Sequence, residues 1–104
     1  MSPEAIIAEE KYHQAKFDKG KLQYSLIPTE ATKALATVLT HGAEKYSPNS
    51  WMNVPDASRR YLDALMRHLE AYRSGDLIDQ DSGLPHLDHL LTNAAFLVAL
   101  QKES

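Results

Sequence analysis

Two histidines in the last quarter of the chain have the spacing of a pair of ligands. His86 and His89 are three residues apart, and Asn93 follows one turn later. Residues three or four apart share one face of a helix, so these side chains can point into one space. Imidazoles bind divalent metals and accept protons near neutral pH. The pair therefore predicts a metal site, unless each ring only hydrogen-bonds to a neighbour.

The acidic segment before these histidines offers oxygen ligands. Asp79 and Asp81 lie in a short stretch that also contains Ser82 and Gly83. Carboxylates suit hard cations such as Mg²⁺ or Mn²⁺, although the spacing is not that of an EF-hand and exposed acidic loops are usually only solvated. The chain has no cysteine, so thiolate ligands are excluded. We expect Asp79, His86 and His89 to hold a divalent metal ion, with Mg²⁺ or Mn²⁺ favoured over Zn²⁺ or Fe.

A polar stripe on an earlier predicted helix has the composition of a phosphate site. Arg60, Asp63 and Arg67 recur at helical spacing, and His68 lies toward the more apolar side. Guanidinium groups bind phosphate oxygens in pairs of hydrogen bonds. Arg60 and Arg67 are therefore predicted to contact substrate, and Asp63 and His68 are candidate catalytic residues. The alternative is a solvated helix face on which Asp63 pairs with Arg67.

The segment from residue 41 to 51 combines a glycine, an acid, a base and a tryptophan. Glu44 is a further candidate catalytic residue, and Lys45 and Asn49 are candidate substrate contacts. Trp51 can stack on a nucleobase, although a single tryptophan in a small domain is more often a core anchor. Lys16 and Lys21 can cover anionic oxygens, or they can simply keep this part of the chain soluble.

Apolar spacing and helix-terminating residues predict the elements that carry these groups. Apolar residues recur at helical spacing in three segments, with proline or a capping residue at their starts and glycine near two of their ends. The fold class is therefore all-α, a small bundle of three to four helices with an extended N-terminal arm. The expected elements are a short helix from Ser2 to about Gln14, an arm from Lys16 to Pro28, and helices from Thr29 to about Lys45, from Asp56 to Arg73 and from Pro85 to about Gln101, with Thr29 and Asp56 as caps.

Composition limits the possible partners. The 104 residues are the length of one domain, 1–104, and 43% of them are hydrophobic. A net charge of -3 gives no general attraction for duplex nucleic acid. No apolar stretch is long enough to span a bilayer and no signal peptide is recognisable, so a cytoplasmic protein is expected. A core this small favours a homo-oligomer with a site shared between chains.

Six segments of the chain form an ordered set of motifs: Lys16 to Lys21, Leu26 to Pro28, His41 to Tyr46, Asn49 to Trp51, Arg67 to Leu69 and Asp79 to His89. In these motifs and their order the chain resembles a phage-associated family, the N-terminal region of dATP/dGTP diphosphohydrolases, over nearly its whole length. The resemblance implies a relationship to the MazG-like all-α nucleotide pyrophosphohydrolases, which use Mg²⁺, commonly form dimers or tetramers, and here would act on nucleotides in the host cytoplasm.

One departure from the MazG-like pattern bears on the metal. The carboxylates of a Glu-x-x-Glu helix and a Glu-x-x-Asp helix hold Mg²⁺ in that group, and this chain has His86-x-x-His89 where the second motif is expected. Imidazoles in place of carboxylates disfavour Mg²⁺ and favour a softer ion or none.

Two hypotheses of function follow. The first is metal-dependent hydrolysis of a purine deoxynucleoside triphosphate to monophosphate and pyrophosphate, with metal-bound water as nucleophile. The second is a non-catalytic protein that sequesters a nucleotide or cyclic-nucleotide signal against host defence. An HD-type phosphohydrolase ranks last because no histidine in the chain is followed directly by an aspartate.

Overall fold

The computed structural model describes residues 19–103, and these residues are all-helical, as predicted. Three α-helices lie close to their expected bounds: α2 spans Thr29–Lys45, α3 spans Ala57–Arg73 and α4 spans His86–Glu103. Two short 3₁₀ helices accompany them, η2 at Tyr24–Leu26 and η3 at Ser50–Asn53. The helix expected from Ser2 to Gln14, and Lys16, lie outside the described residues.

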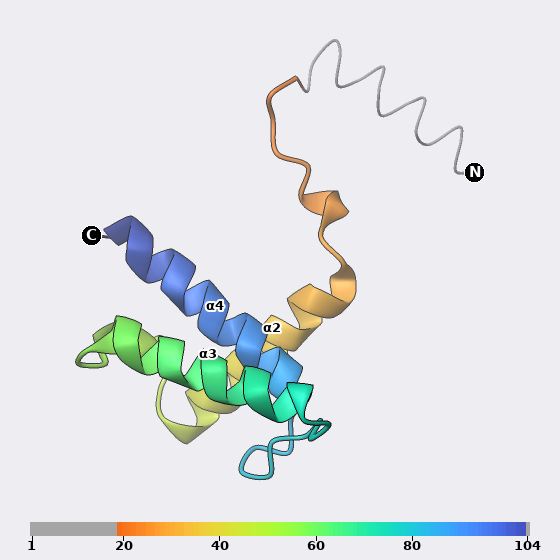
Figure 1. Cartoon of the computed structure of the whole chain (residues 1–104). Coiled ribbons are helices and arrows are strands. Elements are labelled where there is room, and N and C mark those ends of the chain that lie inside the picture. The colour runs from red at the N-terminus through yellow and green to blue at the C-terminus, as the bar shows by residue number, and fades with distance from the viewer. Residues whose placement is uncertain (1–18, 104) are drawn as a thin grey trace.

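Helix α4 is the central element of the arrangement. It packs most extensively against α3 and also contacts α2 (Figure 1). The described part of the N-terminal arm, drawn in orange, runs away from the three helices. Among the helices of residues 19–103, none combines the length and apolarity needed to cross a bilayer.

The arm and the helix starts differ from the sequence predictions. Within the arm, which was expected to be extended, Tyr24–Leu26 form one 3₁₀ turn, and the side chains of Leu22, Tyr24 and Leu26 are exposed. Thr29 is the first residue of α2 rather than its cap, since Pro28 occupies that position. Asp56 precedes α3 but its side chain makes no capping hydrogen bond; it binds the Arg59 guanidinium instead. The predicted position of the cap is therefore confirmed for Asp56 and wrong for Thr29, and neither helix start has a side-chain capping hydrogen bond.

The most buried side chains of α4 are polar. Among the described residues, only His86, Thr92 and Asn93 are buried, at 8%, 1% and 8% exposure, and no apolar side chain is buried. Buried polar groups need partners. Thr92 donates from Oγ1 to the carbonyl of Asp88, and Asn93 donates from Nδ2 to the carbonyl of His89. Both of these buried polar side chains therefore have their partners within α4 itself.

Candidate functional site

The loop between α3 and α4 folds back on itself before α4 begins. Gly75 adopts a φ of 97°, a left-handed conformation that favours glycine, directly after α3. An isolated antiparallel bridge joins Ile78 and Pro85, and the amide of Asp79 donates to the carbonyl of Leu84 at 2.9 Å. This closure places the Asp79 side chain beside the first turn of α4.

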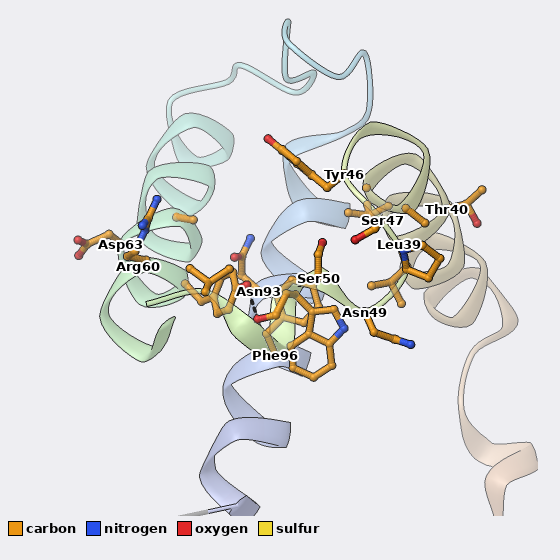
Figure 2. A pocket seen from close by; sticks show the side chains of 18 of the residues that line it. Leu39, Thr40, Tyr46, Ser47, Asn49, Ser50, Arg60, Asp63, Asn93 and Phe96 are labelled. Atoms are coloured by element: carbon orange, nitrogen blue, oxygen red, sulfur yellow. Dashed lines mark hydrogen bonds between the residues drawn. The ribbon is translucent and has the colours of Figure 1, made fainter. Parts of the chain in front are cut away.

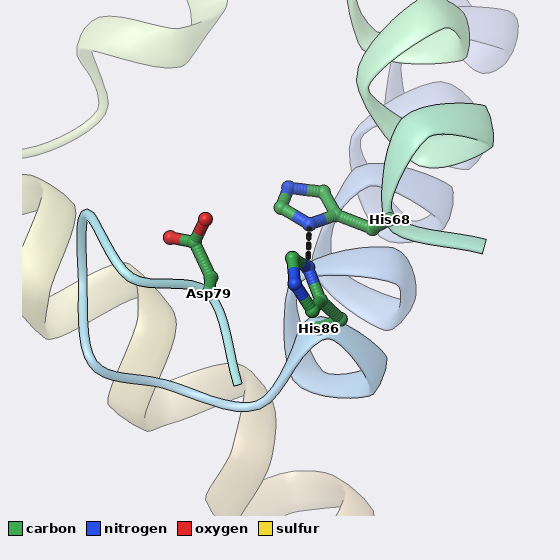
Figure 3. Close-up of side chains that lie close together, drawn as sticks. All are labelled: His68, Asp79 and His86. Carbon is green, nitrogen blue, oxygen red and sulfur yellow. Dashed lines mark hydrogen bonds between the residues drawn. The ribbon is translucent and has the colours of Figure 1, made fainter. Parts of the chain in front are cut away.

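Four side chains gather at this point, and we call His68, Asp79, His86 and His89 the histidine cluster. Nδ1 of His68 and Nδ1 of His86 are 2.8 Å apart (Figure 3). The His68 and His89 rings stack with centroids 4.7 Å apart, and Nε2 of His89 lies 3.6 Å from the Asp79 carboxylate. The structure therefore brings one residue of α3, one of the loop and two of α4 together.

Within the cluster, the atoms best placed to hold one metal ion come from His68, Asp79 and His86. Their ligand atoms all lie within 4.8 Å of one another. The sequence prediction had assigned the metal to Asp79, His86 and His89 and had given His68 a catalytic role. His89 lies next to this group, with its Nε2 engaged elsewhere.

Two residues that sequence reasoning missed hold the cluster in place. The Ser82 hydroxyl donates to Asp79 Oδ2 at 2.7 Å, so it accepts the proton on His89 Nε2, which also lies 2.7 Å away. Asp76 places Oδ2 at 3.3 Å from Nε2 of His86. Ser82 stands three residues after Asp79, a spacing typical of a local side-chain turn, which is the signal that could have identified it.

The electrostatics of the cluster favour the neutral form of two of its imidazoles. Burial lowers the pKa of His68, and the neighbouring His89 and His86 lower it further. Burial also lowers the pKa of His89, with His41 of α2 among the groups that contribute. Burial alone would raise the pKa of Asp79, but the hydrogen bonds from Ser82 bring it below its usual value. At pH 7 His68 and His89 are therefore neutral, and Asp79 is a carboxylate.

These shifts predict a pH dependence of stability in the metal-free chain. A histidine whose pKa is lower in the folded than in the unfolded state binds fewer protons when folded, so acidification favours unfolding. The free energy of unfolding is expected to fall as the pH drops through about 6.5, the unfolded-state value, and to level off below the folded-state pKa. Urea titrations in EDTA between about pH 8 and pH 5 measure this change in the free energy of unfolding.

The control is the His89→Gln variant, which is expected to show a shallower decrease because one of the shifted groups is gone. A parent chain whose stability is constant, or rises, on acidification over this interval would contradict the assignment of neutral histidines.

A pocket of about 1250 Å³ lies between α2, α3 and α4. Its walls come from α2, the segment that follows α2, the first half of α3, and Asn93 and Phe96 of α4 (Figure 2). Five predicted site residues line it: Asn49, Trp51, Arg60, Asp63 and Arg67.

An aromatic group forms one wall of the pocket. Trp51 stacks on Phe96 with ring centroids 4.6 Å apart and planes 15° from parallel. Tyr61 tilts against Phe96 at 4.8 Å and donates its hydroxyl proton to the carbonyl of Trp51. Trp51 is half-buried, so it contributes to packing and still lines the pocket.

The arginines of the pocket differ in their partners. Arg59 pairs with Asp56 and Asp63. The ion pair expected between Asp63 and Arg67 was wrong, because Asp63 faces Arg59 one turn earlier. Arg60 and Arg67 form no ion pair with any residue in the range 19–103, which leaves their guanidinium groups available to an anion.

The pocket and the histidine cluster are built on the same two helices. Arg67 of the pocket and His68 of the cluster are consecutive on α3. On α4, Asn93 lines the pocket and donates to the carbonyl of His89 in the cluster. Those two residues are four apart, about 6 Å along the helix axis.

Three predicted site residues lie apart from this arrangement. Glu44 and Lys45 are exposed at the end of α2 and do not line the pocket, and the Lys45 ammonium lies 5.2 Å from the Tyr46 ring centroid. Lys21 is exposed on the arm.

Comparison with known proteins places the chain in a family. The model of the family described as dATP/dGTP diphosphohydrolase, N-terminal, matches residues 11–104. The chain belongs to this family. The match includes every residue of the pocket and of the histidine cluster, and it confirms the resemblance seen in the ordered motifs.

A relative in this family comes from Salmonella phage PMBT28 and is named dATP/dGTP diphosphohydrolase. It is 39% identical over 83 residues, which cover 79% of this chain and 28% of the relative. The chain thus spans less than a third of that protein's length. No solved structure matches the chain.

Proposed function

We propose that this domain binds a purine deoxynucleoside triphosphate and hydrolyses it to the monophosphate and pyrophosphate. The observation that carries the proposal is a pocket with an aromatic wall and two arginines that have no ion-pair partner within residues 19–103, one helical turn along α4 from a cluster of three imidazoles and a carboxylate. The family match and the name of the phage relative support the choice of substrate and reaction.

The pocket suits a nucleotide because it offers aromatic rings for the base and guanidinium groups for the phosphates. Trp51, Phe96 and Tyr61 offer flat apolar surface on which a purine can stack. Arg60 and Arg67 can bind phosphate oxygens with charge-assisted hydrogen bonds. Of the arginines that line the pocket, Arg67 is the one next in sequence to His68 of the cluster, so it is the proposed contact for the phosphate that reacts.

The cluster can supply the groups that hydrolysis needs. His89, which lies outside the group His68, Asp79 and His86 and whose pKa is lowered by burial, can accept a proton from an attacking water, and the Asp79 carboxylate beside it can orient that water. The MazG-like resemblance implies Mg²⁺, but two imidazole nitrogens and one carboxylate fit that ion poorly, because Mg²⁺ prefers oxygen ligands in an octahedron. The reaction is therefore assigned here to the side chains of the cluster, without a step through Mg²⁺.

The proposal is tested by product analysis. The purified chain is incubated with dATP, dGTP, ATP and GTP, each with EDTA, Mg²⁺ or Mn²⁺, and the products are separated by ion-exchange chromatography. Formation of deoxynucleoside monophosphate and pyrophosphate in equal amounts is expected. Nucleotide binding without turnover under every condition would contradict hydrolysis and would favour the sequestering hypothesis.

The proposal includes self-association through α3. Leu62, Met66, Leu69 and Tyr72 recur at i, i+4, i+7 and i+10, and each is more than 40% exposed. Such a stripe needs an apolar partner, and the described residues provide no buried apolar core of their own. A second copy of the chain presents the same stripe, so a two-fold pairing of α3 helices covers both.

Sedimentation analysis is expected to give at least twice the chain mass of 11.7 kDa. The Met66→Glu variant should be a monomer, since it places a charge in the stripe. Val98→Glu is the matched control, because Val98 is equally exposed but lies on α4. A monomeric parent at every concentration would rule out this pairing.

A further inference from the structure

We propose that His68, Asp79 and His86 form a binding site for a first-row transition-metal ion of the Zn²⁺ class, and that the site discriminates against Mg²⁺. The inference deepens the proposed function by naming the ion of the same site. The inference rests on the proposed function only for the role of the ion. The geometry that supports the metal site involves no nucleotide.

The ligand atoms are already close to coordinating positions. Two nitrogens bound to one ion at about 2.0–2.1 Å lie roughly 3 Å apart. The Nδ1 atoms of His68 and His86 face each other at 2.8 Å, so the two rings need only small movements to share an ion. Asp79 lies on the loop beside both rings and completes a group whose ligand atoms are all within 4.8 Å of one another (Figure 3).

The hydrogen bonds around the ligands favour the protonation states that metal binding needs. Metal-binding histidines usually donate their second ring N–H to a carboxylate or carbonyl. Asp76 occupies that position for His86, with 3.3 Å between Oδ2 and Nε2, so a proton on Nε2 leaves the Nδ1 lone pair free. Ser82 holds Oδ2 of Asp79 through its hydroxyl and its amide, which fixes the orientation of that carboxylate.

The donor set selects the class of ion. Two imidazoles and one carboxylate suit Zn²⁺ and neighbouring transition metals, which accept nitrogen readily. Mg²⁺ gains little from imidazole and requires more oxygen ligands than the three residues supply. Three protein ligands also leave coordination positions open, an arrangement typical of catalytic rather than structural zinc sites.

Co²⁺ provides the direct test because its visible absorption reports the ligand field. The untagged, EDTA-treated chain is titrated with Co²⁺ and then with Zn²⁺ or Mg²⁺ as competitors. We expect one Co²⁺ per chain with a visible band, displacement by an equimolar amount of Zn²⁺, and no displacement by Mg²⁺ in about thousandfold excess, as the Irving–Williams order and ligand softness require.

Variants in one loop give matched controls. Asp79→Asn is expected to weaken Co²⁺ binding by at least about tenfold. Asp76→Asn is expected to weaken it by about 10–100-fold, which is typical when a metal-binding histidine loses the carboxylate that holds its second ring nitrogen. Asp81→Asn should bind as the parent does, because Asp81 is exposed in the same loop and lies outside the ligand group. Circular dichroism of each variant verifies that the helices are retained.

Failure of the inference is distinct from failure of the proposed function. Absence of a Co²⁺ band, displacement of the ion by Mg²⁺, or binding unchanged in Asp79→Asn would overturn the metal assignment even if the chain hydrolyses nucleotides. A specific Co²⁺ site in a chain without hydrolytic activity would support the metal assignment and contradict the function.

Discussion

The Arg67→Ala variant is expected to lose about 100-fold in kcat/KM for dGTP hydrolysis, equivalent to about 2.7 kcal/mol of transition-state stabilisation. Arg67 lines the pocket, has no ion-pair partner within residues 19–103 and directly precedes His68 of the cluster. Its guanidinium is therefore the group best placed to neutralise charge on the phosphates as they reach the cluster. Steady-state kinetics of pyrophosphate release measure the loss.

Arg73→Ala is the control for this prediction. Arg73 lies on the same helix but is paired with Glu70 and is not part of the pocket wall. Its removal should leave kcat/KM within about twofold of the parent, as is usual for an exposed ion pair. If Arg67→Ala retained parental kinetics, the phosphate-binding role of Arg67 would be wrong.

The Asp79→Asn variant is expected to lower kcat by about 100-fold or more while leaving KM nearly unchanged. Asp79 is the one carboxylate of the histidine cluster, and asparagine has the same shape without its charge. The loss therefore falls on the chemical step rather than on nucleotide binding in the pocket. Single-turnover measurements with dGTP separate the rate of the chemical step from the affinity for the nucleotide.

Asp81→Asn provides the comparison within the same loop, since Asp81 is exposed and the substitution removes the same charge. Parental kcat is expected for it. Equal losses in the two variants would indicate a general effect of loop charge, and an Asp79→Asn variant with parental kcat would remove Asp79 from the reaction.

Helix positions were predictable from sequence because they depend on local spacing. The recurrence of Leu35, Val38 and Leu39, and of Leu62, Leu65 and Met66, is sufficient to place α2 and α3 within one or two residues. The spacing of His86 and His89 likewise predicts a shared face, which α4 confirms by bringing both rings to His68.

The contacts that complete the cluster were harder to predict from the sequence. The roles of Asp76 and Ser82 depend on how the loop closes through the Ile78–Pro85 bridge, and no helical or strand period encodes that closure. The placement of Glu44 also depends on tertiary structure, because the residue lies on the exposed end of α2 rather than in the pocket.

The wrong ion pair has a specific cause. Asp63 has an arginine one turn away in each direction, and the order of acid before base favours Arg67 in an isolated helix. The side chain of Asp56, the N-cap residue of α3, binds Arg59 rather than a backbone amide, and Arg59 also pairs with Asp63. A residue outside the helix thus decides which arginine remains available to the ligand.

The central claim is that the pocket and the histidine cluster form one nucleotide site, and an NMR titration of the isotope-labelled chain with a non-hydrolysable dGTP analogue tests it most directly. The account predicts that the indole N–H of Trp51, the resonances of Arg67 and the imidazoles of His68 and His89 shift together along a single binding curve. Shifts confined to residues outside both groups, or an absence of shifts at millimolar analogue, would contradict it.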